Sequence, residues 1–583
     1  MKVLEAMKVT RMEKLSSNDN FLRRLFLIHV SASIVSMFGA MANTIANSII
    51  AGKFFGADGL AVMSVTAPFY SLFAAVGALI GVGGSTLASF ALGSDDQDKA
   101  DEAFTLSVFA SVIISAIVAA ICLLNLESLL YIAGCTPEVY DAARNYSIIY
   151  LIGGFGTAMF YLPYNFFKLT GKLNWLTQLF LSMAALNVVL DLVFINLGMQ
   201  IEAIALGTVL ASVIASLVGI FLLREDFSFH RQISKQAMLS LAKLGSPAAS
   251  NNLLMSLQLV LLNQIFLAAA GKLGLAILSV ILAIENFSAV IIYGLAQATS
   301  PFIGVFTKEL DTLSVRLIEK YALISGAASM VILTIIIVLF AENICLSFEI
   351  HDSAAIEAVK IFAYSLIPTI ICLMLFFYYQ SAGFTEIANI LIFLKTFLLI
   401  VLPAYLLIPY GLSAVCWSFM ISAVGSMLVL LPLLLRYPPD LTRPLLQDLN
   451  AEKNGNYISF SVTANEAEIM NSVEDIEMFC ESNNLPQRQA MLVQLSMEEM
   501  MVSIAEHSDT KQLDVRILVV DNKIILRIRS GGKMFNPLAY KSSGEDEDDD
   551  TIGIKMIRNM TDNISYKSTL GINNLTVVID YEG

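Results

Sequence analysis

Long apolar runs separated by short polar stretches dominate the first 440 residues of the chain. A helix that crosses a bilayer needs roughly 20 mostly apolar residues. Runs of this length predict transmembrane helices rather than strands. We expect twelve spans, near residues 24–50, 59–92, 103–125, 139–168, 172–197, 202–223, 236–270, 272–307, 315–341, 355–383, 386–408 and 412–436.

Beyond residue 440 the pattern becomes that of a small soluble domain. Alternating apolar and polar positions predict strands, and wider apolar spacing predicts helices. The expected fold class is therefore an all-α polytopic membrane protein with 12 transmembrane helices in two six-helix repeats, followed by a small soluble α+β sandwich domain. The expected strands are 458–462, 513–520, 523–529 and 575–581, and the expected helices are 476–484, 489–507 and 553–562.

Composition supports this division. The chain is 57% hydrophobic and only 14% charged, whereas soluble domains contain about 25% charged residues. Residues from 451 onward hold 12 Lys and Arg against 22 Asp and Glu, so this end carries −10 of the net charge of −14. The six cysteines are scattered without a CxxC pair, which excludes a disulfide framework or a Cys-based zinc site.

Basic residues predict the orientation of the membrane part. The polar start of the chain contains no short apolar region with a cleavage site, so we expect a retained tail rather than a signal peptide. Basic loops fall on the same side as this tail, which predicts that both termini are cytoplasmic, in a bacterial inner membrane. The predicted parts are a tail (1–23), an N-lobe (24–223), an inter-lobe loop (224–235), a C-lobe (236–437), a linker (438–452) and a cytoplasmic domain (453–583).

The two halves contain an internal repeat. AGKFFGADGLAVMSV (51–65) is echoed by AAGKLGLAILSV (269–280) about 215 residues later. Six spans per half is an even number, so the halves share one orientation and are expected to enclose a cleft. This arrangement favours a transporter over a channel, because the sequence contains no filter-like loop or ring of like charges.

One carboxylate interrupts an apolar run in LNVVLDLVFINLG (186–198). An Asp at the centre of a spanning helix costs roughly 2.5–3.5 kcal/mol, so Asp191 must face protein or water. Asn187 lies one turn earlier on the same face. A carboxylate that can be neutral or charged predicts a proton or Na⁺ site, and the alternative is a structural contact between helices. Pro403 lies near the corresponding place in the second half, so the acidic site belongs to one lobe.

Two other charges lie inside the predicted spans, Glu285 and Lys395. They could pair with each other, line a substrate cavity or serve packing alone. Lys395 could also extend its amine toward the membrane surface, as lysines near span ends do.

Residues of about 20–437 resemble the multidrug and toxic compound extrusion (MATE) transporters. The resemblance rests on NSIIAGKFFGADGLAVMSVTAP, GVGGSTLASFALGSDDQDKADEAF, LNVVLDLVF followed by AIALGTVLAS, and GLAQATSPFIGVF. It implies export of organic cations or amphipathic compounds in exchange for H⁺ or Na⁺, without a cofactor or enzymatic activity in the membrane part. It also implies an ion-coupling network of Asn187, Asp191 and Thr208. The family's first-span aspartate position is Asn47 here, so Asp191 would carry the charge change alone.

Residues 455–583 resemble the histidine-kinase-like ATPase fold of the anti-sigma-factor serine-kinase type. The resemblance rests on SMEEMMVSIAEH, SGGKMFNPL, TIGIKMI and DNISYKSTLGINNLTVVI. It implies Glu499 as a catalytic base. Ser503 replaces the Asn that helps to hold Mg²⁺, and Ser530 replaces the Asp that binds adenine. Other residues of the nucleotide-binding loops are retained, among them Gly532, Phe535 and Gly553.

These replacements favour a fold that has lost its nucleotide and binds a regulatory protein instead. Weak ATP and Mg²⁺ binding, or active kinase or ATPase chemistry, are the alternatives. The acidic run GEDEDDDT (544–551) lies where the family has its ATP lid and would repel a triphosphate.

Three functions compete. The favoured one is a secondary active exporter of small molecules with a regulatory or protein-binding domain at 453–583. The first alternative is a membrane-bound sensor whose transporter-like part binds a ligand while the domain binds a cytoplasmic partner. The second is a flippase for a lipid-linked substrate, which predicts a basic cavity, whereas Lys395 is the only basic candidate well inside the spans. The expected partners are a small molecule, membrane lipid and a cytoplasmic protein, with no nucleic acid.

Overall fold

The computed structural model describes residues 19–434 (except 231, 310 and 349), 457–532 (except 521–522), 535–536 and 563–580. The chain divides into two compact units, Phe26–Pro438 (the membrane unit) and Met1–Leu25 with Pro439–Gly583 (the second unit). The predicted linker, the helix expected at 553–562, Gly553 and the acidic run lie outside the described residues.

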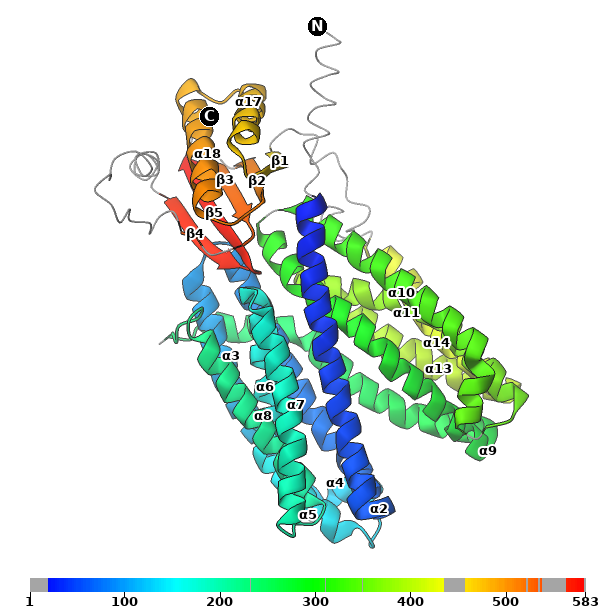
Figure 1. Cartoon of the computed structure of the whole chain (residues 1–583). Helices are drawn as coiled ribbons and strands as arrows, with labels where there is room; N and C mark the ends of the chain where they lie inside the picture. Colours follow the sequence, from blue (N-terminus) through cyan, green and yellow to red (C-terminus); the bar gives the residue numbers. More distant parts are fainter. Residues whose placement is uncertain are drawn as a thin grey trace. The chain divides into compact units, whose positions relative to one another are not determined.

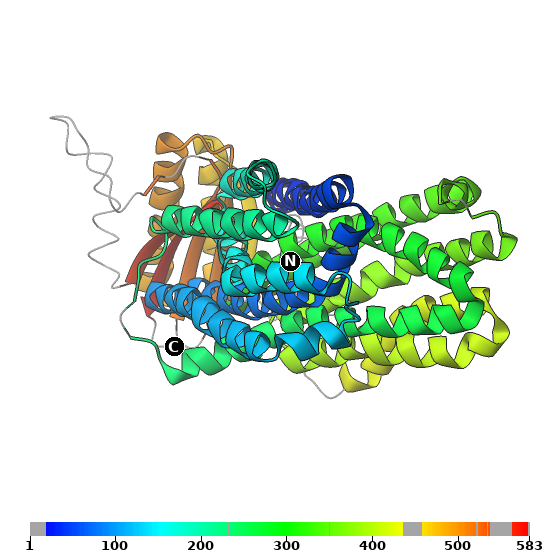
Figure 2. The same cartoon turned by 90° about the horizontal axis from the view of Figure 1, so that it is seen from below.

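The membrane unit consists of two helical bundles that lie side by side (Figures 1 and 2). The N-lobe, blue to cyan, contains α2 (Asp19–Gly93), α3 (Gln97–Leu124), α4 (Leu126–Ile132), α5 (Tyr140–Gly153), α6 (Phe155–Thr170), α7 (Leu173–Asn196) and α8 (Glu202–Leu223). The C-lobe, green to yellow, contains α9 (Lys235–Lys308), α10 (Thr312–Ser347), α11 (Ser353–Ser381), α12 (Thr385–Phe393), the π-helical turn η1 (Leu394–Leu398), α13 (Leu399–Leu407), the 3₁₀ turn η2 (Ile408–Tyr410) and α14 (Leu412–Leu434).

Many of these helices are long and apolar enough to cross a membrane. Among the described residues there are 10 such helices, or 11 if the pair α5 and α6, bent by 45°, forms one span. That number counts α9 once, although its 74 residues are interrupted at Ala270 and Gly271 and have room for two spans. The membrane unit is thus polytopic and helical, and the count of twelve spans in two repeats stays a prediction.

The long helices α2 and α9 break in the same way. Gly56 has φ 64° and ψ −147°, and Gly271, 215 residues later, has φ 58° and ψ −137°. Only glycine adopts this backbone conformation readily. Gly59 and Gly274 each follow the break by three residues. Each lies against a carbonyl oxygen of the helical segment before the break, so neither position has room for a Cβ atom.

The ends of corresponding helices in the two lobes also share local structure. Asp96 and Asp311, also 215 residues apart, cap α3 and α10, and each side chain accepts a hydrogen bond from the backbone N–H three residues later. Gly171 and Gly383 follow α6 and α11 with φ of 72° and 88°. Two copies of one six-helix unit would share such local structure.

The second unit contains a five-stranded antiparallel sheet and two helices. The strand order is β1-β2-β3-β5-β4. Apolar side chains of the sheet, such as Ile517 and Leu526, form one core with Met497 and Met500 of α18. The elements are β1 (Tyr457–Thr463), α17 (Glu466–Ser482), α18 (Gln487–His507), β2 (Gln512–Val520), β3 (Lys523–Ser530), β4 (Asn563–Thr569) and β5 (Ile572–Asp580).

The four expected strands are present, and β4 is an additional strand that the sequence pattern did not reveal. A hairpin turn at Leu570 and Gly571, with φ of 61° and 73°, joins β4 to β5. Two positive φ angles are usually encoded by Asn-Gly or Asp-Gly, and Leu-Gly lacks that signal.

Candidate functional site

Four polar side chains of the N-lobe meet between three helices. Asn187 and Asp191 come from α7, Thr208 from α8 and Asn47 from α2. The Asn187 Nδ2 donates to Asp191 Oδ1 and to Thr208 Oγ1, each at 3.2 Å. The Asn47 Nδ2 also donates to Thr208 Oγ1 at 3.2 Å. The structure thus brings together all four residues predicted for ion coupling, here called the N-lobe polar cluster.

This cluster is shielded from solvent and rich in unused acceptors. Asp191 is 0% exposed and Asn187 is 1% exposed. Within the described part of the chain, Asp191 Oδ2, Asn187 Oδ1 and Asn47 Oδ1 have no hydrogen-bond partner. Buried polar atoms are normally satisfied, and a buried carboxylate without a cation is costly. A proton on Asp191, or a small cation among these oxygens, would remove that cost.

Close packing of α7 on α8 places the carboxylate. A Cβ atom at Gly207 would overlap Asp191 Oδ1, so only glycine at this position of α8 leaves room for the side chain. The resemblance implied no role for Gly207. The available signal was a glycine inside an apolar helix, where it costs about 1 kcal/mol relative to alanine and therefore often marks a close approach.

We expect Gly207→Ala to impair any function of Asp191. The added methyl group must displace the carboxylate or separate α7 from α8, and overpacking of this kind costs roughly 1–3 kcal/mol. Gly39→Ala is the matched control, since a Cβ at Gly39 would lie 3.6 Å from Leu181 Cδ2, an ordinary contact. Thermal unfolding and gradient-driven transport of both variants check this prediction. Equal behaviour of the two variants would contradict it.

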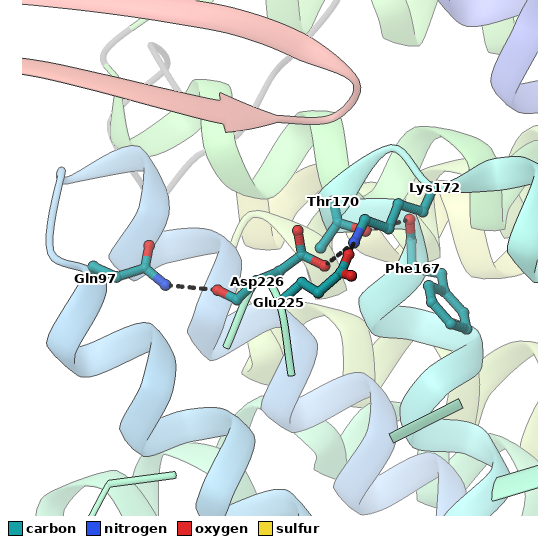
Figure 3. Close-up of polar contacts among 6 residues, drawn as sticks. All are labelled: Gln97, Phe167, Thr170, Lys172, Glu225 and Asp226. Atoms are coloured by element: carbon teal, nitrogen blue, oxygen red, sulfur yellow. Dashed lines mark hydrogen bonds and ion pairs between the residues drawn. The ribbon is translucent and has the colours of Figure 1, made fainter. Parts of the chain in front are cut away.

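An ion-pair cluster holds the other ends of α7 and α8 together (Figure 3). Lys172, which precedes α7, places its Nζ 2.8 Å from Glu225 Oε2 and 2.9 Å from Asp226 Oδ2, both just beyond α8. The Gln97 Nε2 of α3 donates to the Asp226 carbonyl oxygen at 3.1 Å. These contacts fix the antiparallel pair that carries most of the N-lobe polar cluster.

The pKa values in this ion-pair cluster reflect competition between burial and pairing. Burial lowers the pKa of Lys172, but hydrogen bonds to Glu225 and Asp226 outweigh it, and the net pKa is raised. The hydrogen bond from Lys172 lowers the pKa of Glu225. Burial raises the pKa of Asp226 even though Lys172 opposes this effect.

We expect Lys172→Gln to lower the free energy of unfolding by roughly 1–3 kcal/mol at pH 7, because it leaves Asp226 partly buried without its cation. The contribution of Lys172 should persist below about pH 10.5 and disappear as pH rises through its raised pKa. That of Glu225 should persist above about pH 4.5 and disappear as pH falls through its lowered pKa.

Thermal unfolding of the full chain in detergent, repeated across pH, measures this effect. Lys99→Gln is the control, because Lys99 forms an exposed pair with Asp96 and such pairs contribute less than about 1 kcal/mol. A Lys172→Gln variant as stable as the control would show that this ion-pair cluster does not stabilise the fold.

A cavity of about 500 Å³ lies between the lobes. Glu285 of α9 and Lys395 of η1 both line it, together with Tyr70 and Tyr161 of the N-lobe and Tyr293 of the C-lobe. Both charged residues therefore lie on the wall of this cavity. None of the four residues of the N-lobe polar cluster lines this central cavity.

Two buried charged residues were not predicted from the sequence. Lys168 of α6 and Glu319 of α10 are each 1% exposed. Both lie near the ends of predicted spans, where charged residues normally reach water. Packing between helices, which the apolar pattern does not reveal, buries them.

The residues predicted for nucleotide binding lie on α18 and at the end of β3. Glu499 and Ser503 belong to α18, and burial, followed by the neighbouring Glu498 and Glu506, raises the pKa of Glu499. Ser530, 1% exposed, ends β3.

The loop after β3 returns to the end of α18. Gly532 has φ 91°, and a Cβ there would overlap Asp509 Oδ1. Phe535 stacks on His507, with ring centroids 5.0 Å apart. These contacts hold the loop against the end of α18. Nucleotide binding by this unit stays a prediction.

Comparisons with known proteins agree with the fold of the membrane unit. The MatE family model matches residues 32–193. The multidrug export protein MepA of Staphylococcus haemolyticus (strain JCSC1435) is 24% identical over 416 residues, which cover 68% of this chain and 90% of that protein. MepA of Staphylococcus saprophyticus is 24% identical over 388 residues, covering 64% of this chain and 85% of the relative.

Solved structures show the same architecture. A MATE protein in complex with MaL6 superposes with a TM-score of 0.66 at 23% identity, over 71% of this chain and 96% of that one. A multidrug resistance MATE family transporter of the MOP superfamily, in an outward-facing conformation, gives a TM-score of 0.64 at 23% identity, over 70% and 94% of the two chains. The membrane unit therefore has the fold of the MATE proteins.

Proposed function

We propose that the chain is a secondary active exporter of organic cations or amphipathic compounds, driven by exchange for H⁺ or Na⁺ in a bacterial plasma membrane. The observation that carries this proposal is the separation of two sites. The N-lobe polar cluster offers a buried carboxylate with unused acceptors, and the central cavity of about 500 Å³ is large enough for a small organic molecule.

Exchange requires that ion binding and substrate binding favour different conformations of the two lobes. Neutralising Asp191 removes an uncompensated charge from the tight contact with Gly207 and thereby changes the free energy of that packing. A shift from one conformation to the other needs only a few kcal/mol of differential binding. Asp191 acts alone as the titrating group of this cluster, because its other members are amides and a hydroxyl.

Everted membrane vesicles that contain the protein test this proposal. Uptake of a fluorescent organic cation, and of a fluorescent amphiphile, is followed under an imposed pH gradient and then under a Na⁺ gradient. Uptake that depends on one gradient supports exchange and identifies the ion. If neither gradient drives uptake of either compound, the membrane-bound sensor becomes the better proposal.

For the second unit we propose a regulatory or protein-binding role. Ser503 and Ser530 stand where the related ATPases use Asn and Asp, and serine cannot supply the charged acceptor for adenine. A cytoplasmic protein is the expected partner.

A further inference from the structure

Lys168 is a buried cation at the boundary of the two lobes. Its Nζ donates to Gln297 Oε1 of the C-lobe at 2.7 Å and lies 3.4 Å from the centroid of the Tyr164 ring. In the part of the chain that the structure describes, no carboxylate forms an ion pair with it. An ionisable group held inside a membrane protein at this cost is a functional candidate.

A small cavity adjoins this amine. It has a volume of about 20 Å³ and is lined by polar side chains of both lobes, among them Ser89, Asn165 and Gln380. Gln380 is 2% exposed, and its Oε1 has no hydrogen-bond partner among the described residues. The volume admits one water-sized group, such as one oxygen of a larger molecule.

This small cavity lies one helical turn from the central cavity. Tyr161 and Tyr293 line the central cavity, whereas Asn165 and Gln297, four residues later on α6 and α9, line the small one. Residues four apart share a helix face. Lys168 therefore lies on the continuation of the central cavity between the lobes.

The central cavity and the small cavity together form one path between the lobes, and the ionisable side chains along this path sum to a positive charge. The central cavity contributes Glu285 and Lys395, which are opposite in sign and interact. Lys168 adds a second cation without adding an anion. Lys395 belongs to the π-helical turn η1, a local distortion that is frequent at functional sites. The sequence placed only one basic residue, Lys395, well inside the spans, and the structure adds Lys168 as a second lysine, buried between the lobes.

We propose that this path accepts amphiphiles carrying a carboxylate or phosphate group, whose oxygens bind Lys168 while Lys395 adds positive charge further along the same path. Resting on the proposed export function, this inference narrows its substrates from cations to compounds with an oxyanion. Ammonium groups form strong charge-assisted hydrogen bonds to such oxygens. The amide of Gln380 lines the same cavity, and a side-chain amide carries two N–H donors.

Three compounds that share one fluorescent aromatic body test the proposal. They differ only in the head group, which is trimethylammonium, carboxylate or phosphate monoester. Binding to the full chain in nanodiscs is measured by fluorescence anisotropy. We expect one or both anionic compounds to bind more tightly than the cation. Lys168→Gln and Lys395→Gln should each weaken anion binding by about tenfold or more, whereas Glu285→Gln should not weaken it.

Lys243→Gln, at an exposed lysine of α9, is the control for loss of positive charge and should leave all three affinities unchanged. If Lys168→Gln weakens the three compounds equally, Lys168 is a lock between the lobes and the inference is wrong. Tightest binding of the cation would also overturn it, while gradient-driven uptake of that cation would leave the export function standing. Anion binding without uptake under either gradient would retain the binding site and reject export.

Discussion

Asp191→Asn should reduce gradient-driven uptake to the level of vesicles without the protein. The amide has nearly the shape of the carboxyl group, so Asn187 and Thr208 keep a polar neighbour while the reversible charge is lost. No other member of the N-lobe polar cluster titrates, and none can replace it. Insertion and thermal stability should be preserved, because the substitution removes a buried charge that has no cation beside it.

Asp141→Asn is the matched control, since Asp141 is an exposed carboxylate at the start of α5. This control variant should transport normally. Uptake by both variants is measured in everted vesicles at equal protein levels, under the gradient that drives the wild type. Normal transport by Asp191→Asn would assign the carboxylate to structure and favour the sensor alternative.

The sequence revealed those parts of the site that depend on spacing within one helix. A carboxylate in an apolar run, with an amide one turn earlier, identified Asp191 and Asn187. Asn47 and Thr208 came from the resemblance, because they lie on other helices and no local pattern joins them to Asp191. The structure adds the geometry that connects all four.

Features that depend on packing between helices remained hidden. Lys168 and Glu319 lie where the apolar runs end, and only their neighbours on other helices bury them. Gly207 is one glycine among the 33 of the chain, and its role becomes visible only when α7 packs on α8. The fold of the second unit was largely predictable because strand alternation is local, and β4 was missed because Leu570 is unusual in a two-residue turn.

Gly245→Val should shift the two lobes away from the arrangement seen here. Gly245 of α9 lies against α2 of the N-lobe, where a Cβ atom would overlap the Leu79 carbonyl oxygen and lie 2.6 Å from its carbon. Gly83 of α2 is equally confined, since its Cβ would lie 2.9 Å from the Gly245 nitrogen. Backbone atoms cannot move aside by rotation as side chains do, so the added atoms must separate the helices.

Overpacking of this kind costs roughly 1–3 kcal/mol, which changes the ratio of two conformations by about 5–150-fold. The contact lies near the start of α9, at the end of the membrane unit that carries the inter-lobe loop and that the charge pattern predicts to be cytoplasmic. We therefore expect this end to open and net export to fall, because a transporter held in one conformation completes no cycle.

The opening is measured as the distance between two spin labels. They are attached to cysteines introduced at Lys99 and Lys320, which are exposed residues of the N-lobe and the C-lobe. Cys135 is replaced by serine in this background. The distance distribution should move to longer values in Gly245→Val. It should stay unchanged in Gly52→Val, where a Cβ would lie 3.6 Å from a flexible leucine side chain. An unaltered distance together with normal export would mean that the lobes do not separate at this contact. Opening together with lost export would connect the glycine contact between α2 and α9 to the conformational cycle, independently of which ion or substrate the protein uses.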